Sequence, residues 1–114
     1  MEEVNNMKTF EDYGVKDWHE VTKEGKHIMF WHADWCPDCK FIEPKLPELE
    51  QEYSDFNWIS FNRDDNMEIA QELGIMGIPS FIIIENGKEI GRLVNKDRKT
   101  KEEVETFINS VVNK

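Results

Sequence analysis

The chain has 114 residues, of which 39% are hydrophobic and 33% charged, values that are typical of one globular domain with a single core. Its 24 acidic residues outnumber the 14 basic ones and give a formal net charge of −10, which argues against nucleic acid and anionic membrane surfaces as partners. No apolar run approaches the ~18 residues needed to span a bilayer. We therefore expect a single domain over residues 1–114, acting as a monomer and away from membranes.

The N-terminal segment bears on the compartment. Residues 1–6 are acidic and polar, the opposite of the basic segment that opens a leader peptide. On this ground we expect a cytoplasmic location. Disulfides in a reducing cytosol are usually catalytic rather than structural, so the two cysteines of the chain, Cys36 and Cys39, are candidates for chemistry.

Helix and strand patterns alternate through the first half of the chain. Apolar residues at three-residue steps predict a short helix over residues 15–24. The nearly continuous apolar run 27–33 predicts a strand covered on both faces. A longer helix is predicted over residues 38–53, kinked by Pro44, which removes one backbone donor. The role of residues 1–10 stays open between an edge strand and an extra helical turn.

The alternation continues in the second half. The pattern predicts a strand over residues 56–61, a short helix over 66–73 and a strongly apolar strand over 80–85. Asn86-Gly87 is a two-residue hairpin signal, so residues 88–94 should return antiparallel.

A terminal helix is predicted after Thr100, which forms a capping box with Glu103. An apolar stripe follows at helical spacing, made of Val104, Phe107, Ile108, Val111 and Val112. The alternating order of strands and helices along the whole chain favours an α/β layer fold.

Both cysteines lie in the segment Trp35-Cys36-Pro37-Asp38-Cys39, between a predicted strand and a predicted helix. Two thiols separated by two residues can close a disulfide within one helical turn and reopen it, so the pattern predicts a thiol–disulfide oxidoreductase. A structural role is the weaker interpretation, because a disulfide that closes a loop of about four residues contributes only roughly 2 kcal/mol.

A metal site is a second alternative, since His27 and His32 precede the two cysteines at spacings similar to those of zinc ligands. The two histidines lie an odd number of residues apart on one predicted strand, so their side chains leave opposite faces. We therefore expect no metal site. A cluster shared between two chains through Cys36 stays open as a further alternative.

Four features of the sequence, taken together, resemble the thioredoxin family over nearly the whole chain. They are Ala33-Asp34-Trp35-Cys36-x-x-Cys39-Lys40, the helix proline Pro44, the segment Gly74-Ile75-Met76-Gly77-Ile78-Pro79-Ser80, and Asn86-Gly87 between the last two strands. The resemblance implies an α/β thioredoxin fold with a central mixed β-sheet flanked by helices. It also implies a dithiol site with no bound cofactor, recharged by a flavin-dependent thioredoxin reductase.

The resemblance assigns roles to individual residues. It implies that Cys36, at the start of a helix, is the nucleophile that forms a mixed disulfide, and that Cys39 resolves it. Trp35 would shield the site and offer contact surface. The Ile78-Pro79 peptide would be cis and face the cysteines, leaving neighbouring backbone free to pair with an extended substrate.

The residues around the cysteines depart from the usual family pattern. Pro37-Asp38 stands where thioredoxins usually have Gly-Pro, and these two positions tune the nucleophile and its redox potential. The charge of Asp38 should raise the pKa of the Cys36 thiol, whereas Lys40 should lower it.

A second departure lies on the predicted strand before the cysteines. Thioredoxins usually bury an aspartate six residues before the first cysteine, near a lysine on the next strand. Phe30 stands at the first position, and Ser60 or Phe61 at the second, depending on the counting point. The acid that assists proton transfer at Cys39 is therefore missing. His32 could replace it as a proton carrier, but we favour a half-buried structural histidine with a backbone partner.

We therefore predict an enzyme that reduces disulfides of proteins. One alternative is a specialised reductase of mixed disulfides with low-molecular-weight thiols, favoured by Pro37 and by the missing acid. Another is a binding module that takes partners in the groove beside Pro79, with the Cys36–Cys39 pair as a redox switch.

Overall fold

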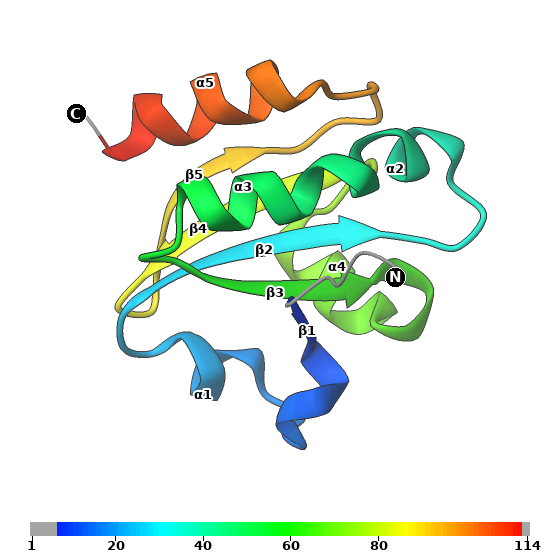
Figure 1. Ribbon diagram of the computed structural model, residues 1–114. Coiled ribbons are helices and arrows are strands. Elements are labelled where there is room, and N and C mark those ends of the chain that lie inside the picture. Colours follow the sequence, from blue (N-terminus) through cyan, green and yellow to red (C-terminus); the bar gives the residue numbers. More distant parts are fainter. Residues whose placement is uncertain (1–6, 113–114) are drawn as a thin grey trace, which may run out of the picture.

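The computed structural model describes residues 7–112, which form a single α/β domain around a five-stranded sheet (Figure 1). The strand order is β1-β3-β2-β4-β5. The pairs β1/β3 and β2/β3 are parallel, and the pairs β2/β4 and β4/β5 are antiparallel. The strands are β1 (Lys8–Thr9), β2 (Lys26–His32), β3 (Asn57–Asn62), β4 (Ser80–Glu85) and β5 (Lys88–Leu93). The sheet is therefore mixed, as the resemblance implies.

Helices cover both faces of the sheet. They are α1 (Trp18–Thr22), α2 (Pro37–Ile42), α3 (Leu46–Glu52), α4 (Met67–Leu73) and α5 (Lys101–Val112). In Figure 1, α3 and α5 lie over one face and α1 and α4 over the other. Side chains alternate along each strand, so β2 contributes Ile28 and Phe30 to the core under α3 and α5, and Met29 and Trp31 to the opposite core. None of the helices within residues 7–112 is long and apolar enough to cross a bilayer.

The helix predicted over residues 38–53 is interrupted rather than kinked. A 3-10 turn, Glu43–Lys45, separates α2 from α3. Pro44 lies within this turn and Pro47 in the first turn of α3, and each proline removes a backbone donor from the ladder. Two prolines three residues apart therefore break the helix where one would bend it.

The first helix is shorter than predicted, because Asp17 caps it. The Asp17 side chain accepts a hydrogen bond from the backbone N–H of His19, and α1 covers Trp18–Thr22 rather than residues 15–24. A side-chain acceptor at the N-cap satisfies a backbone N–H of the first turn and so marks where the helix begins.

Both interpretations of the N-terminal segment are partly realised. Lys8 and Thr9 form the edge strand β1, parallel to β3. Phe10–Tyr13 then form a 3-10 turn that Thr9 and Asp12 close with a capping box. Residues 1–6 of the segment lie outside the described residues.

The predicted hairpin is confirmed. Asn86 and Gly87 both have positive φ, +52° and +84°, which is the requirement of the two-residue turn that matches strand twist. The Asn86 side chain also accepts a hydrogen bond from the backbone of Gly25 at 2.8 Å. The capping box of Thr100 and Glu103 at the start of α5 is likewise present.

Candidate active site

The two cysteines lie where β2 gives way to α2. Cys36 is the N-cap of α2 and Pro37 occupies its first turn, where a missing N–H costs nothing. Cys36 and Cys39 form a disulfide with their Cα atoms 5.2 Å apart, within the usual range for such bonds. The backbone N–H of Cys39 donates to Cys36 Sγ at 3.1 Å. The start of α2 thus directs a backbone N–H at the sulfur of Cys36, where it can stabilise a thiolate.

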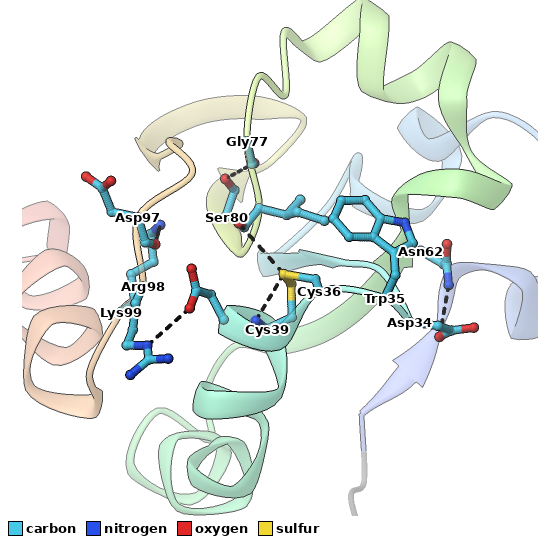
Figure 2. Close-up of a disulfide and its surroundings, with 12 residues drawn as sticks. Asp34, Trp35, Cys36, Cys39, Asn62, Gly77, Ser80, Asp97, Arg98 and Lys99 are labelled. Carbon is cyan, nitrogen blue, oxygen red and sulfur yellow. Dashed lines mark hydrogen bonds and ion pairs between the residues drawn. A yellow bond between two sulfur atoms is a disulfide. The ribbon is translucent and has the colours of Figure 1, made fainter.

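The segment before β4 closes the site from the other side. The Ile78-Pro79 peptide is cis, as the resemblance implies, and the carbonyl oxygen of Ile78 lies 3.9 Å from Cys36 Sγ. Ser80, the first residue of β4, donates from its hydroxyl to the Gly77 carbonyl (Figure 2). The turn that carries the cis bond is therefore tied to the sheet directly beside the disulfide.

Burial distinguishes the two cysteines only slightly. Cys36 is 3% exposed and Cys39 is fully buried, so Cys36 is the one that solvent reaches. Trp35, by contrast, is 59% exposed, and its indole N–H donates to Asp64 Oδ2 at 2.7 Å. The Asp64 contact was not predicted, because it joins residues 29 positions apart in the sequence.

A second unpredicted contact involves Asp38. Arg98, from the loop between β5 and α5, donates from Nε to Asp38 Oδ1 at 3.1 Å. Its guanidinium also lies over the Phe41 ring, 4.4 Å from the centroid. Figure 2 shows Arg98 on one side of the disulfide, with Trp35, Asp34 and Asn62 on the other.

Lys40, expected to lower the pKa of the Cys36 thiol, lies on the side of α2 that faces His32. It lines a surface hollow between β2, β3 and the segment from α2 to α3, together with Phe30, His32 and Ser60. The charge of Lys40 acts on His32 in this hollow and opposes its protonation. The cation placed beside Asp38 is Arg98, which sequence reasoning missed.

The hollow is where the missing acid–base pair would lie. Phe30 and Ser60 are register partners across β2 and β3, so the expected lysine position corresponds to Ser60 rather than Phe61. The His32 ring stacks on Phe30 at 5.2 Å, and its Nε2 lies 3.3 Å from Ser60 Oγ. The partner of His32 is thus a hydroxyl rather than a backbone group. Burial lowers the pKa of His32, which favours the neutral ring.

Metal ligation finds no support in the part of the chain that the structure describes, where no group of three or more His, Cys, Asp and Glu side chains converges. His27 and His32 lie at opposite ends of β2. His27 Nε2 lies 2.7 Å from the carbonyl oxygen of Glu24 and its Nδ1 lies 3.2 Å from the Asn57 amide nitrogen. His27 is therefore engaged far from the cysteines.

Known proteins are similar to this chain in sequence and in fold. The thioredoxin family profile matches residues 7–110. The chain belongs to the thioredoxin family. It is 29% identical over 100 residues to the mitochondrial thioredoxin-2 of Schizosaccharomyces pombe. The aligned region covers 88% of this chain and 72% of that protein. It is 33% identical over 89 residues to the thioredoxin of Mycoplasma genitalium, covering 76% and 86% respectively. A crystal structure of a thioredoxin from Nicotiana alata has the same fold, with a TM-score of 0.79, 23% identity and coverage of 97% and 96%.

Family membership and the Cys36–Cys39 disulfide identify a thiol–disulfide oxidoreductase that acts on protein disulfides. Thioredoxins need no bound cofactor, in agreement with the expectation from sequence. The two alternatives, a reductase specialised for small-thiol mixed disulfides and a redox-switched binding module, are not favoured by these similarities.

The prediction of a cytoplasmic location is contradicted by the same comparisons. Relatives include mitochondrial thioredoxins, the one from S. pombe and the mitochondrial thioredoxin-3 of Saccharomyces cerevisiae, which is 28% identical over 74 residues. The physical reason is that a reducing dithiol serves more than one compartment. A polar N-terminal segment argues only against one type of leader peptide.

Proposed function

We propose that this thioredoxin reduces protein disulfides with Cys36 as the attacking thiol and Cys39 as the resolving thiol. The observation that carries the proposal is the position of Cys36 as the N-cap of α2. The backbone N–H of Cys39 points at its sulfur and the carbonyl of the cis peptide Ile78-Pro79 lies beside it. A thiolate is favoured at such a helix start.

Reduction proceeds by two thiol–disulfide exchange steps. The Cys36 thiolate attacks one sulfur of the substrate disulfide, forming a mixed disulfide and releasing the other sulfur as a thiolate. Cys39 then loses its proton and attacks Cys36 Sγ, which forms the Cys36–Cys39 disulfide and releases the second substrate thiolate. Two electrons pass from the protein to the substrate. A flavin-dependent thioredoxin reductase is the proposed source of the electrons that reopen the disulfide.

The neighbouring residues frame this chemistry. Trp35, more than half exposed and held by Asp64, offers a flat apolar surface to the substrate. Ile78 and Pro79 form the opposite wall. Pro37 fixes the first turn of α2, and Asp38 sets the local charge.

Reduction of insulin disulfides, with and without a flavin-dependent thioredoxin reductase, tests the proposal. Cys36→Ser should abolish turnover, whereas Cys39→Ser should accumulate a mixed disulfide with the substrate, visible by mass spectrometry. Turnover by Cys36→Ser, or trapping through Cys39 instead of Cys36, would contradict the assigned roles. A reduction potential near the roughly −120 mV of a strong oxidant would contradict the direction of electron flow.

A further inference from the structure

The charge between the two cysteines has a fixed partner. Asp38 lies two residues after the N-cap Cys36, and residues two apart on a helix do not face each other. Its carboxylate accepts the hydrogen bond from Arg98 Nε at 3.1 Å, and the side chains of Asp38 and Arg98 are 36% and 56% exposed. The Arg98 guanidinium rests on the Phe41 ring. Stacking on Phe41 and the ion pair with Asp38 together hold Arg98 against α2.

The loop that carries Arg98 is itself held in place by the next residue. Lys99 is 2% exposed, and its ammonium donates to the carbonyls of Asn95 and Asp97 and to the Asn95 side chain. Burial lowers the pKa of Lys99, while the charge of Asp97 acts in the opposite direction. A buried cation with three oxygen partners fixes the path of the loop around it.

The same loop is fastened to the segment that carries the cis peptide. The Ser80 hydroxyl lies 3.4 Å from the Asn95 carbonyl oxygen. A Cβ atom at Gly77 would overlap the backbone of Asn95 and Lys96, so the two segments touch backbone to backbone there. The position of Arg98 is thus fixed relative to α2 and to the segment that carries the cis peptide.

We propose that Arg98 is a positioning residue for the dithiol: it holds the Asp38 carboxylate in an ion pair against the loop before α5 and offsets its charge. Cys36 then keeps the thiolate character that its attack on a disulfide requires. The proposal rests on the assignment of Cys36 as the attacking thiol.

Other charged side chains near the dithiol make contacts of their own or face away from it. Asp34 precedes Trp35 and accepts from the Asn62 amide, and Asp64 is bound by the Trp35 indole. Lys40 lines the hollow on the side of Phe30. The Lys99 ammonium is enclosed by its own loop, and the charges of Asp97, Glu103 and Asp38 oppose the lowering of its pKa by burial. Arg98 is the cation that contacts the carboxylate between the cysteines.

The test is the pH dependence of Cys36 alkylation by iodoacetamide in the fully reduced protein. Arg98→Gln should raise the Cys36 pKa by roughly 0.5–1 unit, the effect of one uncompensated charge near a partly exposed site. Alkylation below the pKa then slows by roughly three- to tenfold. Arg98→Lys, which keeps the charge but not the planar stack, should restore part of the shift.

A double-mutant comparison separates a positioning role from a direct effect of the charge. In the Asp38→Asn background, Arg98→Gln should produce less than about a third of its original shift. An equal shift in both backgrounds would show that Arg98 acts on Cys36 directly and would overturn the proposal. An unchanged pKa in Arg98→Gln would overturn it as well.

Lys26→Gln is the matched control. It also removes one positive charge from an exposed ion pair, with Asp55. Lys26 is the first residue of the seven-residue strand β2, which at roughly 3.3 Å per residue places it about 20 Å from the end that leads to Cys36. Its Cys36 pKa should match that of the unmodified protein. If Cys36→Ser still reduces insulin, the assignment of the attacking thiol fails. If it does not, and the pKa is insensitive to Arg98, only the present inference fails.

Discussion

Two regions beside the dithiol differ in how charged side chains are placed. One is the rim formed by Asp38, Arg98, Trp35 and Asp64, and the other is the hollow beside Phe30. On the side that faces Arg98 and Trp35, Asp38 pairs with Arg98 and Asp64 accepts from the Trp35 indole, both in solvent-exposed contacts. In the hollow, the ionisable pair usual for the family is replaced by Phe30 and Ser60, and the charged side chains present are those of the lining residues Asp34, Lys40 and Glu43. Charges in a low-dielectric interior act strongly and those at a surface are screened. If Arg98 acts as proposed above, electrostatic control of this dithiol lies at its rim, where it is weaker and salt-dependent.

The largest expected effect comes from placing the family's buried acid at Phe30. Phe30 is 2% exposed and packs on Phe81 and the His32 ring, with no cation opposite it in the register, where Ser60 lies. Phe30→Asp should therefore lower the free energy of unfolding at pH 7 by at least about 3 kcal/mol. Urea unfolding measures the loss.

Phe30→Leu is the control for volume, and it should cost only roughly 1–2 kcal/mol. The cost of Phe30→Asp should shrink at low pH, because a protonated carboxyl is easier to bury than a charged one. Equal losses of unfolding free energy for Phe30→Asp and Phe30→Leu at pH 7 would contradict this prediction, because they would mean that the hollow tolerates a charge.

A smaller effect is expected from His32. Burial lowers its pKa below the unfolded value of 6.5, and the carboxylates of Glu43 and Asp34 oppose that shift. The folded protein thus prefers the neutral ring. The stability contributed by this preference is complete above pH 6.5 and is lost as the pH falls from there through the lowered pKa.

His32→Gln should therefore show a flatter dependence of unfolding free energy on pH than the unmodified protein below pH 6.5. Urea titrations in that window measure the difference. Parallel curves would show that His32 does not titrate with folding. Unchanged thiol exchange rates in the same variant would remove His32 from proton transfer at Cys39.

The smallest expected effect concerns the rim near Trp35. Asp64→Ala removes the acceptor of the Trp35 indole N–H and frees an exposed ring. The KM for insulin should rise by roughly threefold with kcat unchanged, because an exposed hydrogen bond of this kind contributes little. Asp65→Ala removes the same charge from the neighbouring position and should leave KM unaltered. A drop in kcat instead would place Asp64 in the chemistry rather than in substrate contact.

The sequence predicted the elements that depend on local chemistry. The hairpin follows from Asn86-Gly87 and the start of α5 from Thr100 and Glu103, since each signal acts within four residues. The interruption between α2 and α3 was underestimated, because the effect of Pro44 was considered without that of Pro47.

The site was predicted as far as the motif reaches along the chain. Cys36, Cys39 and the cis peptide before Pro79 lie where the family resemblance places them. The partners of the flanking residues were not predictable. Arg98 meets Asp38 across 60 residues and Asp64 meets Trp35 across 29, and a lone arginine in a polar loop carries no signal of such a contact.

The close contact of Gly77 with Asn95 and Lys96 bears on how this chain can be lengthened. Surface loops usually accept insertions, because closing a longer loop costs little entropy. Between β5 and α5 an added residue would push against the turn before Pro79, and would shift the Lys99 ammonium from its three oxygens. We expect this loop to be a poor site for a tag or a grafted peptide, although it lies at the surface.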